Sequence, residues 1–283
     1  MSLTITAYST ALFSTWYFVD ELGLLFDAGD GVTAGLLQKS RKIKHIFISH
    51  ADRDHLAGLM QLNQLNADMC PTIYYPKDCA SFPYMKAFFA QFDPHSIGTK
   101  WVGIEASDKI KIRADVYVEA IRNGHVAAAE GIAKSLSYKV FQSKQKLKPE
   151  LAHLSNDEIK QLKIKQPNVS LTVEILTNLL SYSGDTPVED TFRFHSSKIL
   201  IHEATFLAKG DVIESPIKNK HSTLEEVMEM VHKIDLEHLI LGHFSVRYSS
   251  DTIKSAVETL RKKWNITIPI TLVLPGEIVH LKI

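Results

Sequence analysis

Four side chains that can bind metal ions lie within six consecutive residues in the first quarter of the chain. The stretch reads SHADRDH from Ser49, and its metal-capable members are His50, Asp52, Asp54 and His55. Imidazole and carboxylate groups are common protein ligands of divalent cations. His50 and Asp52 stand at alternate positions and can point toward one site, while Asp54 and His55 can point toward a second. Two ions held roughly 3.5–4 Å apart would suit this spacing.

The residues on either side predict that this stretch connects a strand to a helix. Residues 45–48 favour β-structure and are mostly apolar, and residues 56–60 supply an apolar helical stripe. The motif therefore lies at the carboxyl end of a strand, where open α/β sheets place their ligands. The alternative is an ordinary connection with solvated charges, in which Asp54 only favours the helix N-terminus.

Further candidate residues stand at the ends of other predicted strands. They are His125 after residues 116–121, Asp185 after 179–182, Glu203 after 199–201 and His243 after 239–241. His221 precedes an amphipathic helix, for which Ser222 and Glu225 have the form of a capping box. Asp27 lies in the turn FDAGDG; taken alone, we interpret it as a turn residue, and its alternative role is to orient a ligand histidine.

Length and composition favour a globular α/β protein. The chain has 283 residues, of which 45% are apolar, and its 32 basic and 32 acidic residues give no net charge. A global electrostatic attraction to nucleic acid is therefore excluded, although a local patch could supply one. With Cys70 and Cys79 as the only cysteines, a disulfide framework is not expected, and a reducing, cytoplasmic compartment is. We find no signal peptide or membrane span in the sequence.

A basic segment interrupts this balanced composition. Lys139–Lys165 contains seven lysines and three acidic residues, a net charge of +4. We expect it to be the least regular part of the chain, with one helix that begins at the capping box of Ser155 and Glu158 and ends at Lys165. A protrusion of this kind can neutralise RNA phosphates, and it can equally be a solvated basic helix.

Several motifs, in this order, resemble those of ribonuclease Z, the tRNA 3′-processing endonuclease of the metallo-β-lactamase superfamily. They are SHADRDH from Ser49, GH at His125, SGDT from Ser183, HEAT from His202 with HST from His221, and HFSVRY from His243. The resemblance extends from about Leu22 to Tyr248. The motifs HEAT, HST and HxSxRY are more specific to ribonuclease Z than the others, which are widespread in the superfamily. KLKPELAHLSNDEIKQLK from Lys146 is similar to the basic arm of one subgroup of that family.

The resemblance implies a four-layer αββα metallo-β-lactamase-like sandwich, formed by a single domain over residues 1–283 with the arm inserted at about 139–165. It also implies two divalent metal ions. One ion would be held by His50, Asp52, His125 and Asp185, and the other by Asp54, His55, His243 and Asp185. Zinc is the first expectation. Manganese or iron are alternatives, because the family has histidine where this chain has Asp52, and a carboxylate favours harder cations.

The resemblance further implies a role for each remaining candidate. Asp54 would orient the attacking water and take its proton, and Glu203 with His221 would protonate the leaving 3′ oxygen. Ser245 and Arg247 would bind phosphate. Lys144, Lys146 and Lys148 would bind RNA outside the active site.

We therefore predict a metal-dependent endoribonuclease that acts on precursor tRNA or other RNA and forms a homodimer. Two alternatives remain open. One is a hydrolase of small phosphodiesters or other esters, and the other is a weakly active RNA-binding paralogue with a damaged metal site.

Overall fold

The structure is a computed structural model that describes residues 2–93, 98–166, 169–211 and 220–283. In this part of the chain the strands form two seven-stranded sheets. The first contains β1 (Thr4–Thr10), β2 (Ser14–Val19), β3 (Leu24–Phe26), β4 (His45–Phe47), β5 (Thr72–Pro76), β6 (Lys100–Ile104) and β14 (Val279–Lys282), in the order β14-β1-β2-β3-β4-β5-β6. Its strands from β3 to β6 are parallel.

The second sheet repeats this mixed arrangement. It contains β7 (Lys109–Lys111), β8 (Val116–Arg122), β9 (Leu136–Leu147), β10 (Thr172–Tyr182), β11 (Ser197–Glu203), β12 (Leu236–Gly242) and β13 (Ile270–Leu272), in the order β13-β12-β11-β10-β9-β8-β7. Here β10 to β13 are parallel. Each sheet thus has a parallel part whose carboxyl ends are available for a site.

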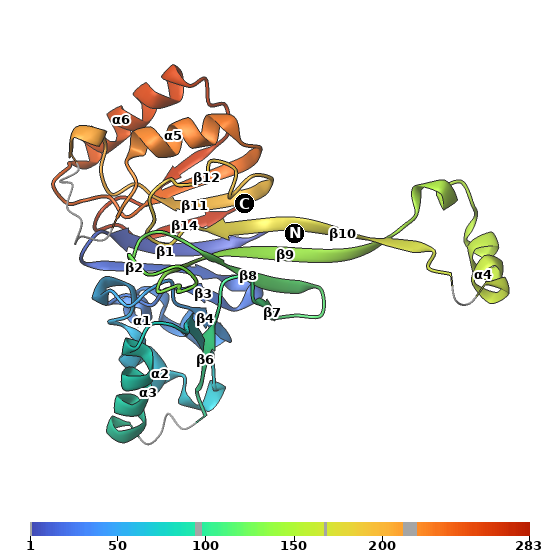
Figure 1. Cartoon of the computed structure of the whole chain (residues 1–283), viewed down its shortest axis with the longest axis horizontal. Helices are drawn as coiled ribbons and strands as arrows, with labels where there is room; N and C mark the ends of the chain where they lie inside the picture. The colour runs from blue at the N-terminus through green and yellow to red at the C-terminus, as the bar shows by residue number, and fades with distance from the viewer. Residues whose placement is uncertain (1, 94–97, 167–168, 212–219) are drawn as a thin grey trace.

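Helices cover the outer face of each sheet (Figure 1). On the first sheet lie α1 (Val32–Leu36), α2 (Leu59–Leu65) and α3 (Ser81–Phe92), and on the second lie α5 (Leu224–Lys233) and α6 (Ser250–Lys263). The predicted αββα sandwich is confirmed. None of the helices in the described residues is long and apolar enough to cross a membrane.

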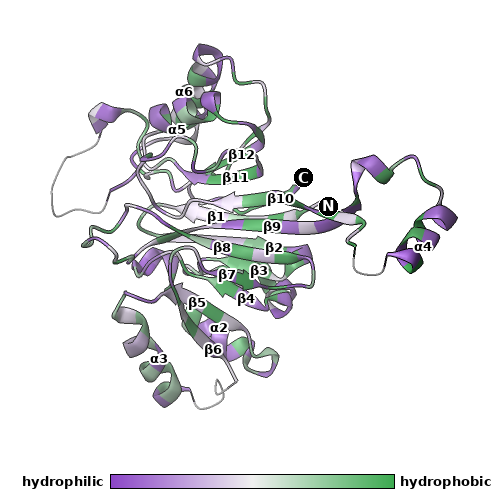
Figure 2. Cartoon of the chain, turned by 45° about the vertical axis from the view of Figure 1, so that its right-hand side comes forward, coloured by the Kyte–Doolittle hydropathy of each residue, from purple (hydrophilic) through white to green (hydrophobic). Residues whose placement is uncertain are grey.

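The strand β2 shows why both faces of the sheets are apolar. Tyr17 and Val19 pack between the sheets, whereas Trp16 and Phe18 belong to the cluster beneath the first set of helices. Successive side chains of a strand point to opposite faces, so a strand buried on both sides needs apolar residues at consecutive positions. Green segments in Figure 2 mark other apolar stretches in the strands at the centre of the sandwich.

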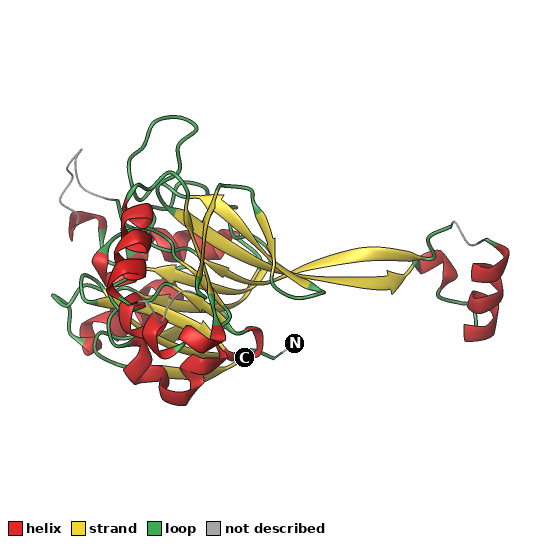
Figure 3. Cartoon of the chain, turned by 90° about the horizontal axis from the view of Figure 1, so that it is seen from below, coloured by secondary structure: helices red, strands yellow, loops and turns green. Residues whose placement is uncertain are grey.

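The basic segment projects from the sandwich as an arm (Figures 1 and 3). The strands β9 and β10 continue as an antiparallel ribbon to the pair of Leu147 and Thr172, and α4 (Asn156–Lys165) lies beyond it. The predicted helix and its capping box are confirmed, because Ser155 accepts a hydrogen bond from the Glu158 N–H. The expectation of irregular structure was wrong for residues 139–147, which pair with β10 despite their alternating lysines.

One local prediction was also wrong. The helix α5 is capped by Thr223 and Glu226, rather than by Ser222 and Glu225, because the Ser222 hydroxyl donates to the Thr186 carbonyl oxygen instead. In α3, the side chains of Phe88 and Phe92 are exposed, since only one side of this helix faces the sheet.

Candidate metal centre

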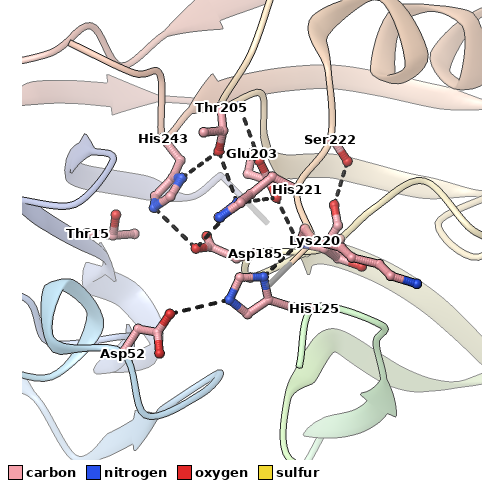
Figure 4. Close-up of polar contacts among 12 residues, drawn as sticks. Thr15, Asp52, His125, Asp185, Glu203, Thr205, Lys220, His221, Ser222 and His243 are labelled. Carbon is pink, nitrogen blue, oxygen red and sulfur yellow. Dashed lines mark hydrogen bonds and ion pairs between the residues drawn. The ribbon is translucent and has the colours of Figure 1, made fainter. Parts of the chain in front are cut away.

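Loops that follow four strands converge between the two sheets (Figure 4). His50, His125 and Asp185 each stand three residues after the last residue of β4, β8 and β10, and His243 directly follows β12. These are the strand ends at which the sequence places its candidate residues. The two sheets can supply ligands to one site because their strands end at the same edge of the sandwich.

One group of these side chains, which we call cluster 2, consists of Asp54, His55, His243 and Asp185. The Nε2 atoms of His55 and His243 each lie 3.2 Å from Oδ2 of Asp185. Oδ2 of Asp54 lies 3.4 Å from Nε2 of His243 and 3.6 Å from Nε2 of His55. The donor atoms of Asp54, His55 and His243 are all within 4.8 Å of one another, close enough to hold one cation.

The other group, cluster 1, consists of His50, Asp52, His125 and again Asp185. The Nε2 atoms of His50 and His125 each lie 3.5 Å from Oδ2 of Asp52, and Nε2 of His50 lies 3.8 Å from Oδ2 of Asp185. Both Nε2 atoms are buried, and their contacts with these carboxylate oxygens are too long for strong hydrogen bonds. Buried polar atoms are rarely left in this state, and a divalent cation between them would satisfy both. The donor set therefore fits a metal ion.

Each histidine of the two clusters has a second contact through Nδ1, which directs its Nε2 toward the centre. The contacts are Ser49 Oγ for His50 at 2.9 Å, Asp27 Oδ2 for His55 at 2.7 Å, the Lys220 carbonyl oxygen for His125 at 2.8 Å, and Thr205 Oγ1 for His243 at 2.8 Å. Such contacts fix the orientation and tautomer of a ring, and they are typical of histidines that bind metal ions.

Asp27 has more than the turn role that we favoured from the sequence, and that interpretation was wrong. Its carboxylate is fully buried beneath the clusters and accepts hydrogen bonds from the Ser49 N–H, the Ser49 hydroxyl and the Tyr182 hydroxyl. The contact with His55 completes this set. The structure instead shows the alternative role, in which Asp27 orients a histidine, here His55.

Glu203 and His221 form a pair beside the clusters (Figure 4). Oε1 of Glu203 lies 3.1 Å from Nδ1 of His221, which is 3.8 Å from Oδ2 of Asp185. Burial disfavours the charged imidazole, but the Glu203 carboxylate outweighs burial and raises the pKa of His221 to about 9. The N–H groups of Thr186 and Thr205 donate to Glu203, so the carboxylate is held in place. This pair can retain a proton at neutral pH and deliver it.

The remaining candidates lie farther from the clusters. Ser245 is half-buried and its N–H donates to the Thr205 carbonyl oxygen, whereas Arg247 is exposed, with its guanidinium 5.1 Å from the centre of the Phe206 ring. Lys144 and Lys146 lie exposed on the ribbon of the arm, and Lys148 follows it. The structure therefore does not bring these three lysines to the metal centre (Figure 3).

Comparisons with known proteins identify the family. Residues 24–244 match the beta-lactamase superfamily domain. The chain is 30% identical to tRNase Z TRZ1 of Arabidopsis thaliana over 224 residues, which are 76% of this chain and 77% of that protein. It is also 26% identical to ribonuclease Z of Archaeoglobus fulgidus over 274 residues, covering 87% of this chain and 85% of the other.

The chain belongs to the ribonuclease Z family of the metallo-β-lactamase superfamily.

Solved structures of this superfamily share the fold. Human tRNase Z, short form, aligns with a TM-score of 0.59 at 16% identity, covering 99% of this chain and 98% of that one. The metallo-β-lactamase fold protein YhfI from Bacillus subtilis aligns with a TM-score of 0.66 at 14% identity, covering 99% of both chains. At these identities the likeness concerns the architecture alone.

For this member of the ribonuclease Z family, sequence reasoning missed Thr205 and the Lys220 carbonyl group. The Thr205 hydroxyl contacts Glu203 at 2.5 Å, His221 at 3.2 Å and His243 at 2.8 Å, so it links the acid pair to cluster 2. Thr205 could have been identified from its place in the HEAT motif, two residues after Glu203. The role of the Lys220 carbonyl group could not, because every residue has a backbone carbonyl group.

Proposed function

We propose that this chain is a metal-dependent endoribonuclease that trims the 3′ end of precursor tRNA. The observation that carries the proposal is the position of Asp185, whose Oδ2 contacts both clusters and lies 3.8 Å from His221 of the acid pair. Metal ligands and a proton donor thus lie around one point, in a chain of the ribonuclease Z family. Several relatives carry the name ribonuclease Z or tRNase Z.

We assign cluster 1 and cluster 2 to one divalent ion each, with Asp185 shared between them. When bound, a pair of such ions would lower the pKa of water and stabilise the charge that develops on phosphate oxygens. The imidazoles of both clusters suit zinc. Asp52 adds an oxygen donor to cluster 1, so manganese and iron are the alternatives there.

The residues of the chain would then perform the proton transfers. The Asp54 carboxylate accepts a proton from the attacking water, and the Leu12 N–H, which donates to Asp54 Oδ2 at 3.0 Å, holds that carboxylate in place. As the bond between phosphorus and the 3′ oxygen breaks, His221 donates a proton to the leaving oxygen and Glu203 stabilises the imidazolium. The products are a free 3′ hydroxyl on the tRNA and a 5′ phosphate on the trailer.

Substrate binding would use two separate regions. Ser245 and Arg247 follow the cluster 2 residue His243 by two and four positions, and a guanidinium can bind phosphate through two parallel hydrogen bonds. Lys144 and Lys146 face the same side of the arm ribbon, since they are two residues apart on β9. The local charge of +4 supports a role for the arm in holding the body of a tRNA.

We further propose a homodimer in the cytoplasm. An open groove of about 450 Å³ between α2 and α3 is lined by Leu56, Ala57, Met60, Tyr84, Met85, Phe88 and Phe89. Its exposed aromatic residues support burial against a second copy, because large apolar patches commonly mark interfaces. The free cysteines Cys70 and Cys79 support a reducing compartment. If the groove is the interface, Phe88→Glu converts the dimer to a monomer in sedimentation experiments.

The decisive experiment is cleavage of a precursor tRNA by the purified protein, with zinc and with manganese. We expect at least one bound ion per chain by elemental analysis, and a tRNA product that ends in a 3′ hydroxyl. Cleavage of a small chromogenic phosphodiester without cleavage of RNA would favour a small-substrate hydrolase. Metal-free protein that binds RNA without cleaving it would favour an inactive paralogue.

A further inference from the structure

The turn between β1 and β2 exposes two large apolar side chains beside the metal centre. Ala11, Leu12 and Phe13 close this hairpin, whose last paired residues are Thr10 and Ser14. Leu12 is 87% exposed and Phe13 is 59% exposed. Tight turns between strands normally contain glycine, asparagine or aspartate. An apolar turn at this position therefore needs an explanation other than turn formation.

Backbone hydrogen bonds hold this turn against the active site. The Leu12 N–H donates to Oδ2 of Asp54 at 3.0 Å, which places the turn in contact with cluster 2. The Ala11 N–H donates to the carbonyl oxygen of Phe244, the residue that follows His243, at 3.3 Å. The position of the turn is thus fixed by contacts with two segments before any substrate binds.

The conformation of Leu12 is unusual for a leucine. Its φ is 69°, in the left-handed region that glycine adopts freely and leucine rarely does. Because its side chain is exposed, packing contributes little free energy to offset this backbone strain. Leu37, at the end of α1, shares the positive φ and the exposure. The feature that distinguishes Leu12 is its N–H contact with Asp54 in cluster 2.

We propose that Leu12 and Phe13 form a platform on which a nucleobase next to the scissile phosphate stacks. The inference rests on the proposed function and extends it to a substrate contact. The cluster residues are polar and suit the phosphate, whereas the base beside that phosphate presents a flat apolar face. An exposed aromatic ring is the common partner of an unpaired base, and stacking tolerates any base.

The first test combines Phe13→Ala with abasic substrates. We compare a normal precursor tRNA with two others that lack the base on the 5′ or on the 3′ side of the cleaved bond. Phe13→Ala should lower kcat/KM on the normal RNA by about tenfold, the size of one lost stacking contact. On one of the abasic substrates, wild type and variant should cleave equally fast. Phe13→Trp should retain activity, because it keeps an aromatic face.

The second test uses a matched pair of glycine variants. Leu12→Gly removes an exposed leucine and relieves a positive φ, so the protein should fold at least as well as wild type. Leu37→Gly does the same at another exposed leucine with a φ of 50°, at the end of α1. We expect a severalfold fall in kcat/KM for precursor tRNA with Leu12→Gly and no change with Leu37→Gly.

The two proposals fail in different ways. If wild type does not cleave precursor tRNA, the proposed function is wrong. If wild type cleaves it but Phe13→Ala cleaves the normal substrate equally well, or loses the same factor on both abasic substrates, the platform is wrong and the function stands.

Discussion

The metal centre and the arm differ in how their functional side chains are held. At the centre, the four histidines of the two clusters are almost completely buried, and each has a contact that fixes its ring. On the arm, Lys144 and Lys146 stand exposed on a two-stranded ribbon. Proton transfer and metal binding need preorganised groups away from water, whereas attraction between lysine and phosphate acts without fixed geometry.

This difference predicts two kinds of mutational effect. Changes at the centre should slow the chemical step for every substrate, because all substrates react there. Changes on the arm should affect only substrates large enough to reach it, since the arm projects from the sandwich (Figure 3). Five experiments, from the largest expected effect to the smallest, test this separation.

Asp185→Ala should cause the largest loss. Its carboxylate contacts both clusters, so its removal should lower metal content and reduce kcat by about 10³-fold or more, for precursor tRNA and for a small phosphodiester alike. Steady-state kinetics and elemental analysis measure the two effects, and circular dichroism verifies folding. A folded variant with normal metal content and activity would show that Asp185 is not a ligand.

Glu203→Ala and His221→Ala should each slow RNA cleavage by about 10²-fold or more, the usual size of a lost general acid. Because the two side chains lie 3.1 Å apart and would act as a unit, the double variant should be little worse than either single one. Metal content should remain normal. Full activity in either single variant would contradict the proposed proton transfer.

Neutralising Lys144, Lys146 and Lys148 to glutamine should weaken binding of precursor tRNA. The slope of log affinity against log salt should flatten by roughly one unit for each lost phosphate contact. Hydrolysis of a small phosphodiester should not change. A matched control neutralises three lysines on α6, namely Lys254, Lys262 and Lys263, and should leave tRNA binding as it was.

Deletion of residues 143–165 should give the same result as the lysine substitutions, with oligomeric state checked in parallel. If a folded deletion variant binds tRNA with unchanged affinity and salt dependence, the arm is not an RNA-binding element. The separation between centre and arm would then be lost, and the small-substrate hydrolase would be the better interpretation.

Asp52→His should have the smallest effect, a severalfold gain in zinc affinity at cluster 1, because imidazole suits zinc better than carboxylate does. Zinc titration of both proteins measures it, with Asp52→Asn as a control that removes the charge without adding an imidazole. Equal affinity and stoichiometry in wild type and Asp52→His would mean that Asp52 does not face a metal ion.

Local sequence patterns were sufficient for the order of strands and loops around the site. Apolar runs that end in Gly, Asp or His located the strand ends before His50, Asp185 and His243 to within one residue, because the strand core and its polar end differ in composition. Helix boundaries were predicted less accurately where two neighbouring residues can both act as the N-cap. The side chains of Ser222 and Thr223 can both cap a helix, and only the contact with Thr186 determines which one does.

By itself, the sequence determined the fold class, the family resemblance and the set of residues that can bind metal ions, since these depend on residue types and their spacing. Only the tertiary structure decided which of them meet. Asp27 is 28 residues from His55, and the Lys220 carbonyl group is 95 residues from His125, yet both pairs are in hydrogen-bond contact. Contacts between distant segments depend on how two sheets pack, and no local pattern encodes that geometry.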